Sequence, residues 1–102
     1  MVECWSAFAR LRRDGVITVR EEESARASLR DLQELWTEVE PSEEVREQAS
    51  RILRLHPLRS QDVLQLSAAL VWAARTRPGG HIVTFDLRLQ EAARLEGLTP
   101  LP

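Results

Sequence analysis

Cysteine and long apolar runs are almost missing from this chain, and each absence excludes a class of protein. Cys4 is the single cysteine among 102 residues, so the chain has neither a disulfide framework nor a paired-cysteine metal site. The two histidines, His56 and His81, are too far apart in sequence for a zinc-ligand spacing. The longest apolar stretch runs from Ser67 to Ala74, well short of the roughly 20 residues that span a bilayer. We therefore expect no disulfide, no zinc site and no membrane span.

Lysine is absent as well, because all fourteen basic residues are arginine, against sixteen acidic residues. The net charge of −2 excludes the overall basic surface of a strong duplex-binding protein. Any nucleic acid must therefore be held by a local patch, for which arginine is a good bidentate ligand. A GC-rich gene explains the arginine bias equally well. The first residues include neither a basic n-region nor an apolar h-region, which predicts a cytoplasmic protein.

Helical periodicity and helix-ending signals divide the chain into five expected helices. These are Val2–Asp14 before Gly15, a second after the capping box Thr18–Glu21, a third from Ser42 to His56-Pro57, a fourth from Ser60 to Arg75 and a last helix ended by Gly97. Apolar stripes predict the buried faces, with Ala25, Leu29, Leu32 and Trp36 in the second helix and Val45, Ala49, Ile52 and Leu53 in the third. The fourth helix is apolar on nearly every side, which predicts the central helix of the fold.

Three short β-rich runs complete the expected elements. His81–Phe85 is predicted to be a buried strand, Leu98–Leu101 a final strand, and Trp36–Val39 a further short strand, while Pro78–Gly80 is expected to be a loop. The strands are joined through helices, which is typical of a parallel sheet flanked by helices. We therefore predict a single helix-rich α/β domain over residues 1–102.

Three acidic residues stand where an α/β fold can form a site. Asp86 directly follows a predicted strand, at the end of the sheet where such folds place their ligands. Asp62 lies in the first turn of the most apolar helix, and Glu3 in the first turn of an amphipathic one. Each also has a structural explanation: Asp62 suits a helix N-terminus, Asp86 can cap a helix and Glu3 can be a solvated surface charge. Periodicity alone does not bring the three together. Cys4 is best explained as a small apolar residue rather than a nucleophile.

Three segments, in order, resemble VapC-type PIN-domain ribonucleases. Leu58–Leu70 (LRSQDVLQLSAAL) is similar to the family's LRAxDALHLAAAL segment. Ile82–Leu89 (IVTFDLRL), with Ala92-Ala93 and Gly97-Leu98 after it, resembles the family's VTFDxRLxxAAxxxGL ending. Val2–Arg10 (VECWSAFAR) looks like its xVExxSALxR helix. The segments that contain Asp62 and Asp86 are specific in combination, whereas the Glu3 segment is weak by itself.

The resemblance implies a PIN-like three-layer α/β/α fold with a short parallel sheet, and an endoribonuclease of toxin–antitoxin systems that depends on Mg²⁺ or Mn²⁺. Glu3, Asp62 and Asp86 would be the catalytic and metal-binding residues, because hard carboxylate oxygens suit these cations. Thr84 would orient Asp86 by hydrogen bonding, and Arg59 and Arg88 would contact RNA phosphate. The implied partners are RNA, a cognate antitoxin protein and further copies of the chain.

One family feature has no counterpart in this sequence, namely a first strand ending in Asp and followed by further helix before the Glu. The domain is therefore expected to be incomplete at its N-terminus and to cleave RNA little or not at all. Trp5, Phe8 and Trp72 are expected to line the apolar surface that the missing elements leave, which predicts a dimer or higher oligomer. The alternative is a catalytically deficient PIN remnant that acts as a protein-interaction module.

Overall fold

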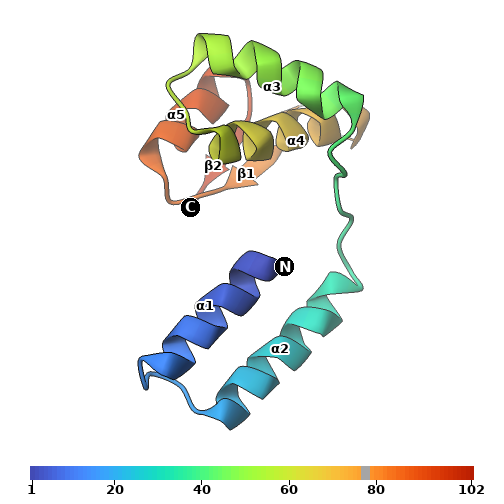
Figure 1. Cartoon of the computed structure of the whole chain (residues 1–102). Coiled ribbons are helices and arrows are strands. Elements are labelled where there is room, and N and C mark those ends of the chain that lie inside the picture. Colours follow the sequence, from blue (N-terminus) through green and yellow to red (C-terminus); the bar gives the residue numbers. More distant parts are fainter. Residues whose placement is uncertain (77–78) are drawn as a thin grey trace. The chain divides into compact units, whose positions relative to one another are not determined.

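The computed structural model describes residues 1–76 and 79–102, so Pro78 of the predicted loop lies outside the described residues. The chain forms two compact units, Met1–Glu38 and Val39–Pro102, and each is described by itself (Figure 1). No helix in the described ranges is both long and apolar enough to cross a membrane. Whether the two units make up one domain, as expected from the sequence, stays a prediction.

The N-terminal unit is a helical hairpin of α1 (Val2–Arg13) and α2 (Val19–Gln33). Gly15 lies in the turn between them with φ +74°, a backbone conformation that favours glycine. The predicted capping box is confirmed, because the Glu21 backbone N–H donates to Thr18 Oγ1 at 3.1 Å and the Glu21 carboxylate reaches back to the Thr18 backbone. These local signals set the start of α2 before any packing is considered.

A buried carboxylate joins the two helices of the hairpin. Glu22 is buried on α2, and its carboxylate pairs with Arg12 of α1 at 2.5 Å and with Arg26 at 3.5 Å. Arg26 also lies over the Trp5 ring, 5.5 Å from its centroid, as a cation–π contact. Leu29 is the large apolar side chain buried in this unit, so polar contacts contribute much of the hairpin's cohesion. Nothing in the sequence pattern predicted that Glu22 would be buried.

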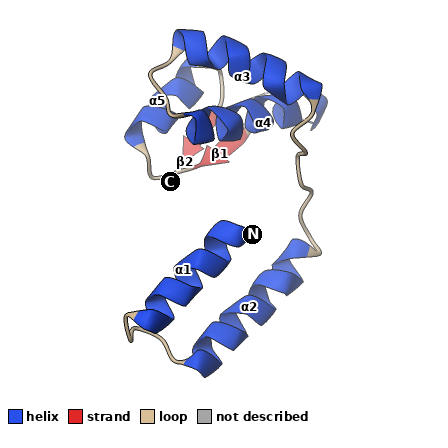
Figure 2. Ribbon diagram, in the orientation of Figure 1, coloured by secondary structure: helices blue, strands red, loops and turns tan. Residues whose placement is uncertain are grey.

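The C-terminal unit contains α3 (Glu43–Leu55), α4 (Ser60–Thr76), β1 (His81–Val83), α5 (Leu87–Leu95) and β2 (Thr99–Leu101). Figure 2 shows the helices in blue and the two strands in red. The strands pair in parallel, with Ile82 opposite Pro100, and α5 forms the crossover between them. A helix-rich α/β architecture with a short parallel sheet is therefore confirmed.

The core of this unit lies around α4, which contacts α3, α5 and β1. Buried apolar side chains from α3, α4, β1 and α5, with Leu98 after α5, meet as one cluster: Ala49, Ile52, Val63, Leu66, Ala73, Ile82, Leu89, Ala92, Ala93 and Leu98. Ser67 is also fully buried, and its hydroxyl donates to the Val63 carbonyl at 2.6 Å, so no polar atom is left unsatisfied there. The prediction that α4 is the central helix is confirmed.

Several finer predictions of elements and burial are wrong. Residues 36–39 form no strand, because the unit to which Trp36 belongs contains no strand to pair with. The predicted buried strand 81–85 ends at Val83, and Val83 is 73% and Phe85 85% exposed. In the C-terminal unit one face of the sheet packs against the core through Ile82, whereas His81 and Val83 point to the other face. Leu53 is also exposed, since its neighbour Ile52 takes the core-facing side of α3.

Candidate functional site

Asp86 lies between β1 and α5, as the sequence predicted. It follows β1 after Thr84 and Phe85 and is the N-cap of α5. Its Oδ1 accepts a hydrogen bond from the Leu89 backbone N–H at 2.9 Å, so the capping explanation for this residue is confirmed. The capping bond uses one carboxylate oxygen, and the other oxygen is available to a ligand.

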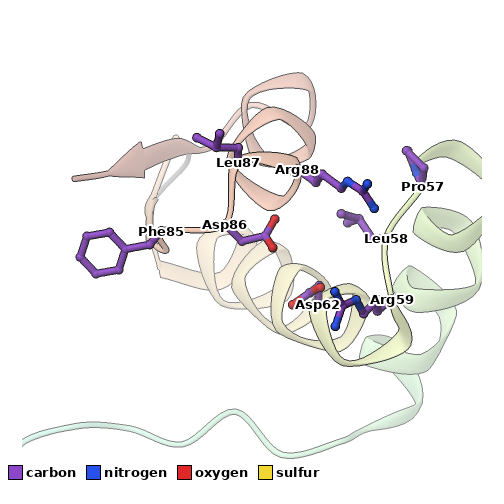
Figure 3. Close-up of a pocket in the computed structure, with 8 residues that line it drawn as sticks. All are labelled: Pro57, Leu58, Arg59, Asp62, Phe85, Asp86, Leu87 and Arg88. Atoms are coloured by element: carbon purple, nitrogen blue, oxygen red, sulfur yellow. The ribbon is translucent and has the colours of Figure 1, made fainter.

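Asp62 faces Asp86 across a surface hollow of about 390 Å³. Asp62 comes from the first turn of α4, where it is half-buried, whereas Asp86 comes from the start of α5. Figure 3 shows both carboxylates pointing into the hollow. The walls are completed by Pro57, Leu58, Arg59, Phe85, Leu87 and Arg88. The packing of α5 against α4 through Leu89 and Leu66 brings these two residues, 24 positions apart, to one site.

Two arginines share this hollow with the carboxylates. Arg59 precedes α4 by one residue and Arg88 belongs to the first turn of α5, and both are exposed. Within residues 1–76 and 79–102 neither guanidinium lies within 4.0 Å of a carboxylate oxygen. Neither guanidinium is therefore held in an ion pair by a described residue, and both groups remain able to bind an anion in the hollow.

Thr84 contacts Asp86 through the backbone rather than through the carboxylate. The Thr84 hydroxyl accepts from the Asp86 backbone N–H at 3.1 Å. The Gln90 side-chain amide in turn donates to the Thr84 carbonyl at 2.7 Å, and the Thr84 N–H donates to the Leu101 carbonyl at 2.8 Å. Thr84 thus fixes the backbone that presents Asp86, a more indirect role than the one expected. Gln90 was missed by the sequence analysis, although its position four residues after Asp86 places it one helical turn away.

Glu3 belongs to α1 in the N-terminal unit, and its side chain is exposed. A hydrogen bond from its own backbone N–H, with the nearby N-terminal amino group, holds the pKa of Glu3 below its usual value. The carboxylate is therefore ionised at neutral pH. Participation of Glu3 in the site of Asp62 and Asp86 stays a prediction from the sequence.

The two carboxylates of the hollow suit a hard divalent cation, although two is a small number of protein ligands. Among the described residues no cluster of three or more His, Cys, Asp or Glu side chains is placed to hold a metal ion. Two carboxylates nevertheless fit Mg²⁺, which usually keeps several waters and is bound through one or two carboxylates together with substrate phosphate. Asp62 and Asp86 would be the protein ligands of such an ion, and the open hollow leaves room for water and phosphate.

An ionic cluster behind the hollow was not anticipated from the sequence. The Glu96 carboxylate accepts from Arg51 at 2.7 Å and lies 2.8 Å from His56 Nε2, and both His56 and Glu96 are largely buried. The hydrogen bond from Arg51 and the interaction with His56 lower the pKa of Glu96 against the opposing effect of burial. The cluster ties the end of α3 to the end of α5, and therefore steadies the residues from Pro57 to Arg59 that follow His56.

A second hollow, of about 360 Å³, opens beside the first between the end of α3 and α5. Pro57, Leu87 and Arg88 line both hollows, so the two adjoin each other. The remaining walls are mostly apolar and are formed by Leu55, His56, Glu91, Ala92 and Leu95. No motif in the sequence marks this surface, because its residues come from two helices more than thirty positions apart.

Comparison of the chain with protein-family models, with curated proteins and with solved structures found no match.

Proposed function

We propose that the chain is a metal-dependent endoribonuclease of the VapC toxin type that works with Mg²⁺ or Mn²⁺. The observation that carries this proposal is the position of Asp62 and Asp86, which face one hollow together with Arg59 and Arg88. Two acids and two unpaired cations in a single open hollow are the groups required to hold a phosphodiester beside a divalent cation. The two segments that carry these residues are also the ones whose resemblance to the family is specific in combination.

The acidic and the basic residues of the hollow would have different roles. Asp62 and Asp86 would hold the cation, and Arg59 and Arg88 would bind non-bridging phosphate oxygens and orient the strand. When bound, the cation supplies positive charge for the phosphate and lowers the pKa of water. The Leu89 N–H, Thr84 and Gln90 keep Asp86 in place, so its free oxygen has a fixed direction. Glu3 is proposed as a further acidic residue of the same site.

The proposed substrate is single-stranded or looped RNA, because unpaired strands offer bases that a protein can read. A PIN-like three-layer fold, a cognate antitoxin protein, self-association and a cytoplasmic location belong to the same proposal. The layered fold is supported in part by the C-terminal unit, in which helices pack against one face of the sheet.

The second candidate is a catalytically deficient PIN remnant that acts as a protein-interaction module. It is favoured by the small donor set, since no group of three possible metal ligands occurs among the described residues. It is also favoured by the exposed apolar side chains of Val83 and Phe85. The two candidates differ in whether acidic residues of the hollow matter for any activity on RNA.

Cleavage of a fluorescent single-stranded RNA separates the candidates. With Mn²⁺ the chain is expected to cleave this RNA slowly. The cleavage rate should fall at least about 100-fold in EDTA, in Asp62→Asn and in Asp86→Asn. EDTA removes the cation, and each substitution removes a charge that holds it in place. Glu3→Gln is expected to act in the same direction.

Asp31→Asn is the matched control, since Asp31 is an exposed acid of α2 outside the hollow. It should leave cleavage unchanged. Cleavage that survives both EDTA and Asp86→Asn would reject the nuclease proposal. Absence of cleavage on every RNA tried would favour the interaction module.

A further inference from the structure

The apolar hollow beside the aspartate site has the composition of a ligand pocket. Its volume of about 360 Å³ falls within the range of pockets that enclose small molecules. Leu55 and Leu95 on its walls are 59% and 68% exposed, which places large apolar side chains in contact with water. A flat apolar ligand that covers them would remove this surface from water and bind favourably.

Arg88 marks the junction between the two hollows, since it lines both. On one side of it lie the carboxylates of Asp62 and Asp86, and on the other the apolar walls. A nucleotide combines the two chemistries in the same order, with an anionic phosphate next to an apolar, planar base. A phosphate held at Arg88 therefore brings the base of a neighbouring nucleotide to the apolar hollow.

We propose that this second hollow is a subsite for one unpaired nucleobase of the strand whose phosphate lies at Asp62 and Asp86. The inference rests on the proposed nuclease function, because it takes the strand to pass through the first hollow. It adds a recognition site that the acidic residues do not provide, and it explains how a chain of net charge −2 holds RNA by more than phosphate contacts.

The polar groups around the hollow indicate which bases it takes. His56 is held by Glu96 at 2.8 Å, so its ring is a fixed part of the wall. Glu91 lines the hollow with an exposed carboxylate, which accepts hydrogen bonds and donates none when ionised. A carboxylate selects bases with amino groups, as in its pairing with cytosine N4. The subsite therefore prefers bases that have an amino group, namely cytosine, adenine and guanine, to uracil.

Binding of short labelled strands to the full chain tests this subsite. Fluorescence anisotropy measures the affinity for a 12-nucleotide oligo(C), an oligo(U) and an abasic strand of the same length, and a gel checks that each stays intact. Leu55→Gln/Leu95→Gln makes the hollow polar without changing its charge. Leu53→Gln is the matched control, because Leu53 is an exposed leucine on the same helix outside the hollow.

The double variant is expected to bind oligo(C) at least about tenfold more weakly than the unchanged chain, the loss expected when an apolar contact of this size is removed. The abasic strand should bind both proteins equally, and Leu53→Gln should bind oligo(C) like the unchanged chain. Thermal melting checks that the double variant is folded, and the single variants, each with an intermediate loss, replace it if it is not.

Equal affinity of the double variant and the unchanged chain for oligo(C) would overturn the inference, as would an equal loss for the abasic strand. A change in self-association without a change in RNA affinity would assign the hollow to a protein partner instead and would also overturn it. Failure of the nuclease proposal gives a different result, namely base-dependent binding that Leu55→Gln/Leu95→Gln weakens but no metal-dependent cleavage. A chain that binds none of the three strands refutes the subsite.

Discussion

At the scale of single residues, Asp86 caps α5 and lines the hollow with the same carboxylate. Substitution separates the two roles, because Asn keeps a capping oxygen whereas Ala does not. We expect Asp86→Ala to lower the free energy of unfolding by about 1 kcal/mol and Asp86→Asn to change it little. Urea unfolding followed by circular dichroism measures both. Equal destabilisation by the two variants would mean that the charge rather than the cap stabilises α5.

Glu96 provides a second residue-scale prediction, on pH. Its pKa is lowered in the folded protein, so the ionised carboxylate stabilises the fold at pH values above the usual 4.5, and this stabilisation is lost as the pH falls through the lower folded pKa. Glu96→Gln should therefore cost about 1–3 kcal/mol at pH 7 and progressively less below pH 4.5. Glu91→Gln, on the exposed face of the same helix, should cost little at either pH. The test is the melting temperature of the unchanged chain and of Glu96→Gln from pH 3 to pH 7. A difference between the two that does not change with pH would exclude the ionised Glu96 pair as its cause.

Which site residues the sequence could predict depends on the range of their contacts. Asp62 and Asp86 were found because each lies within a segment that resembles a family, although periodicity gave no reason to bring them together. The capping role of Asp86 followed from local pattern. The partners of Glu96 lie 40 and 45 residues away, and nothing local to Arg51 or His56 marks them. The part of Glu3 in the site remains a prediction.

At the scale of elements, helices were predicted better than strands for a physical reason. A helix is set by contacts within one turn and by caps such as Thr18 and Ser42, both of which the structure contains. A strand needs a partner, so the β-rich run at Trp36–Val39 stays without regular structure. Exposure also depends on neighbours, and Phe85 was expected to be buried only because its strand was assumed to be covered on both faces.

The two units should differ in independent stability. Every member of the hydrophobic core cluster lies between Ala49 and Leu98, whereas the hairpin of residues 1–38 buries Leu29 and Glu22. Residues 39–102 alone should therefore unfold cooperatively, and residues 1–38 alone should be mostly unfolded, because short isolated helices are marginal in water. Thermal circular dichroism of the two fragments tests this. A cooperative transition in the hairpin fragment would show that the Arg12–Glu22 pair suffices.

At the scale of the whole molecule, the exposed face of the sheet predicts self-association. Val83 and Leu101 are paired neighbours on β1 and β2, and both side chains are exposed. A two-stranded sheet also has two edges, which can pair with a further strand. We expect a dimer or higher oligomer at micromolar concentration and a monomer after Val83→Lys/Leu101→Lys. Light scattering coupled to size exclusion measures both. Leu35→Lys is the control, since Leu35 is exposed but belongs to no strand. A monodisperse monomer before any substitution would refute this prediction.

The capping bond of Asp86 also determines how the two aspartates would change during evolution. Whether or not the chain is a nuclease, selection for stability would keep a side chain at position 86 that caps α5, so Asp, Asn, Ser or Thr would persist there. The Asp62 side chain makes no hydrogen bond to another described residue, and only the modest preference of a helix N-terminus for an acidic residue would act on it if the hollow had no function, so this position would vary more readily. Among descendants of this sequence, the identity of residue 62 would therefore report on the proposed activity of the hollow, whereas an unchanged Asp86 would report only on the cap of α5.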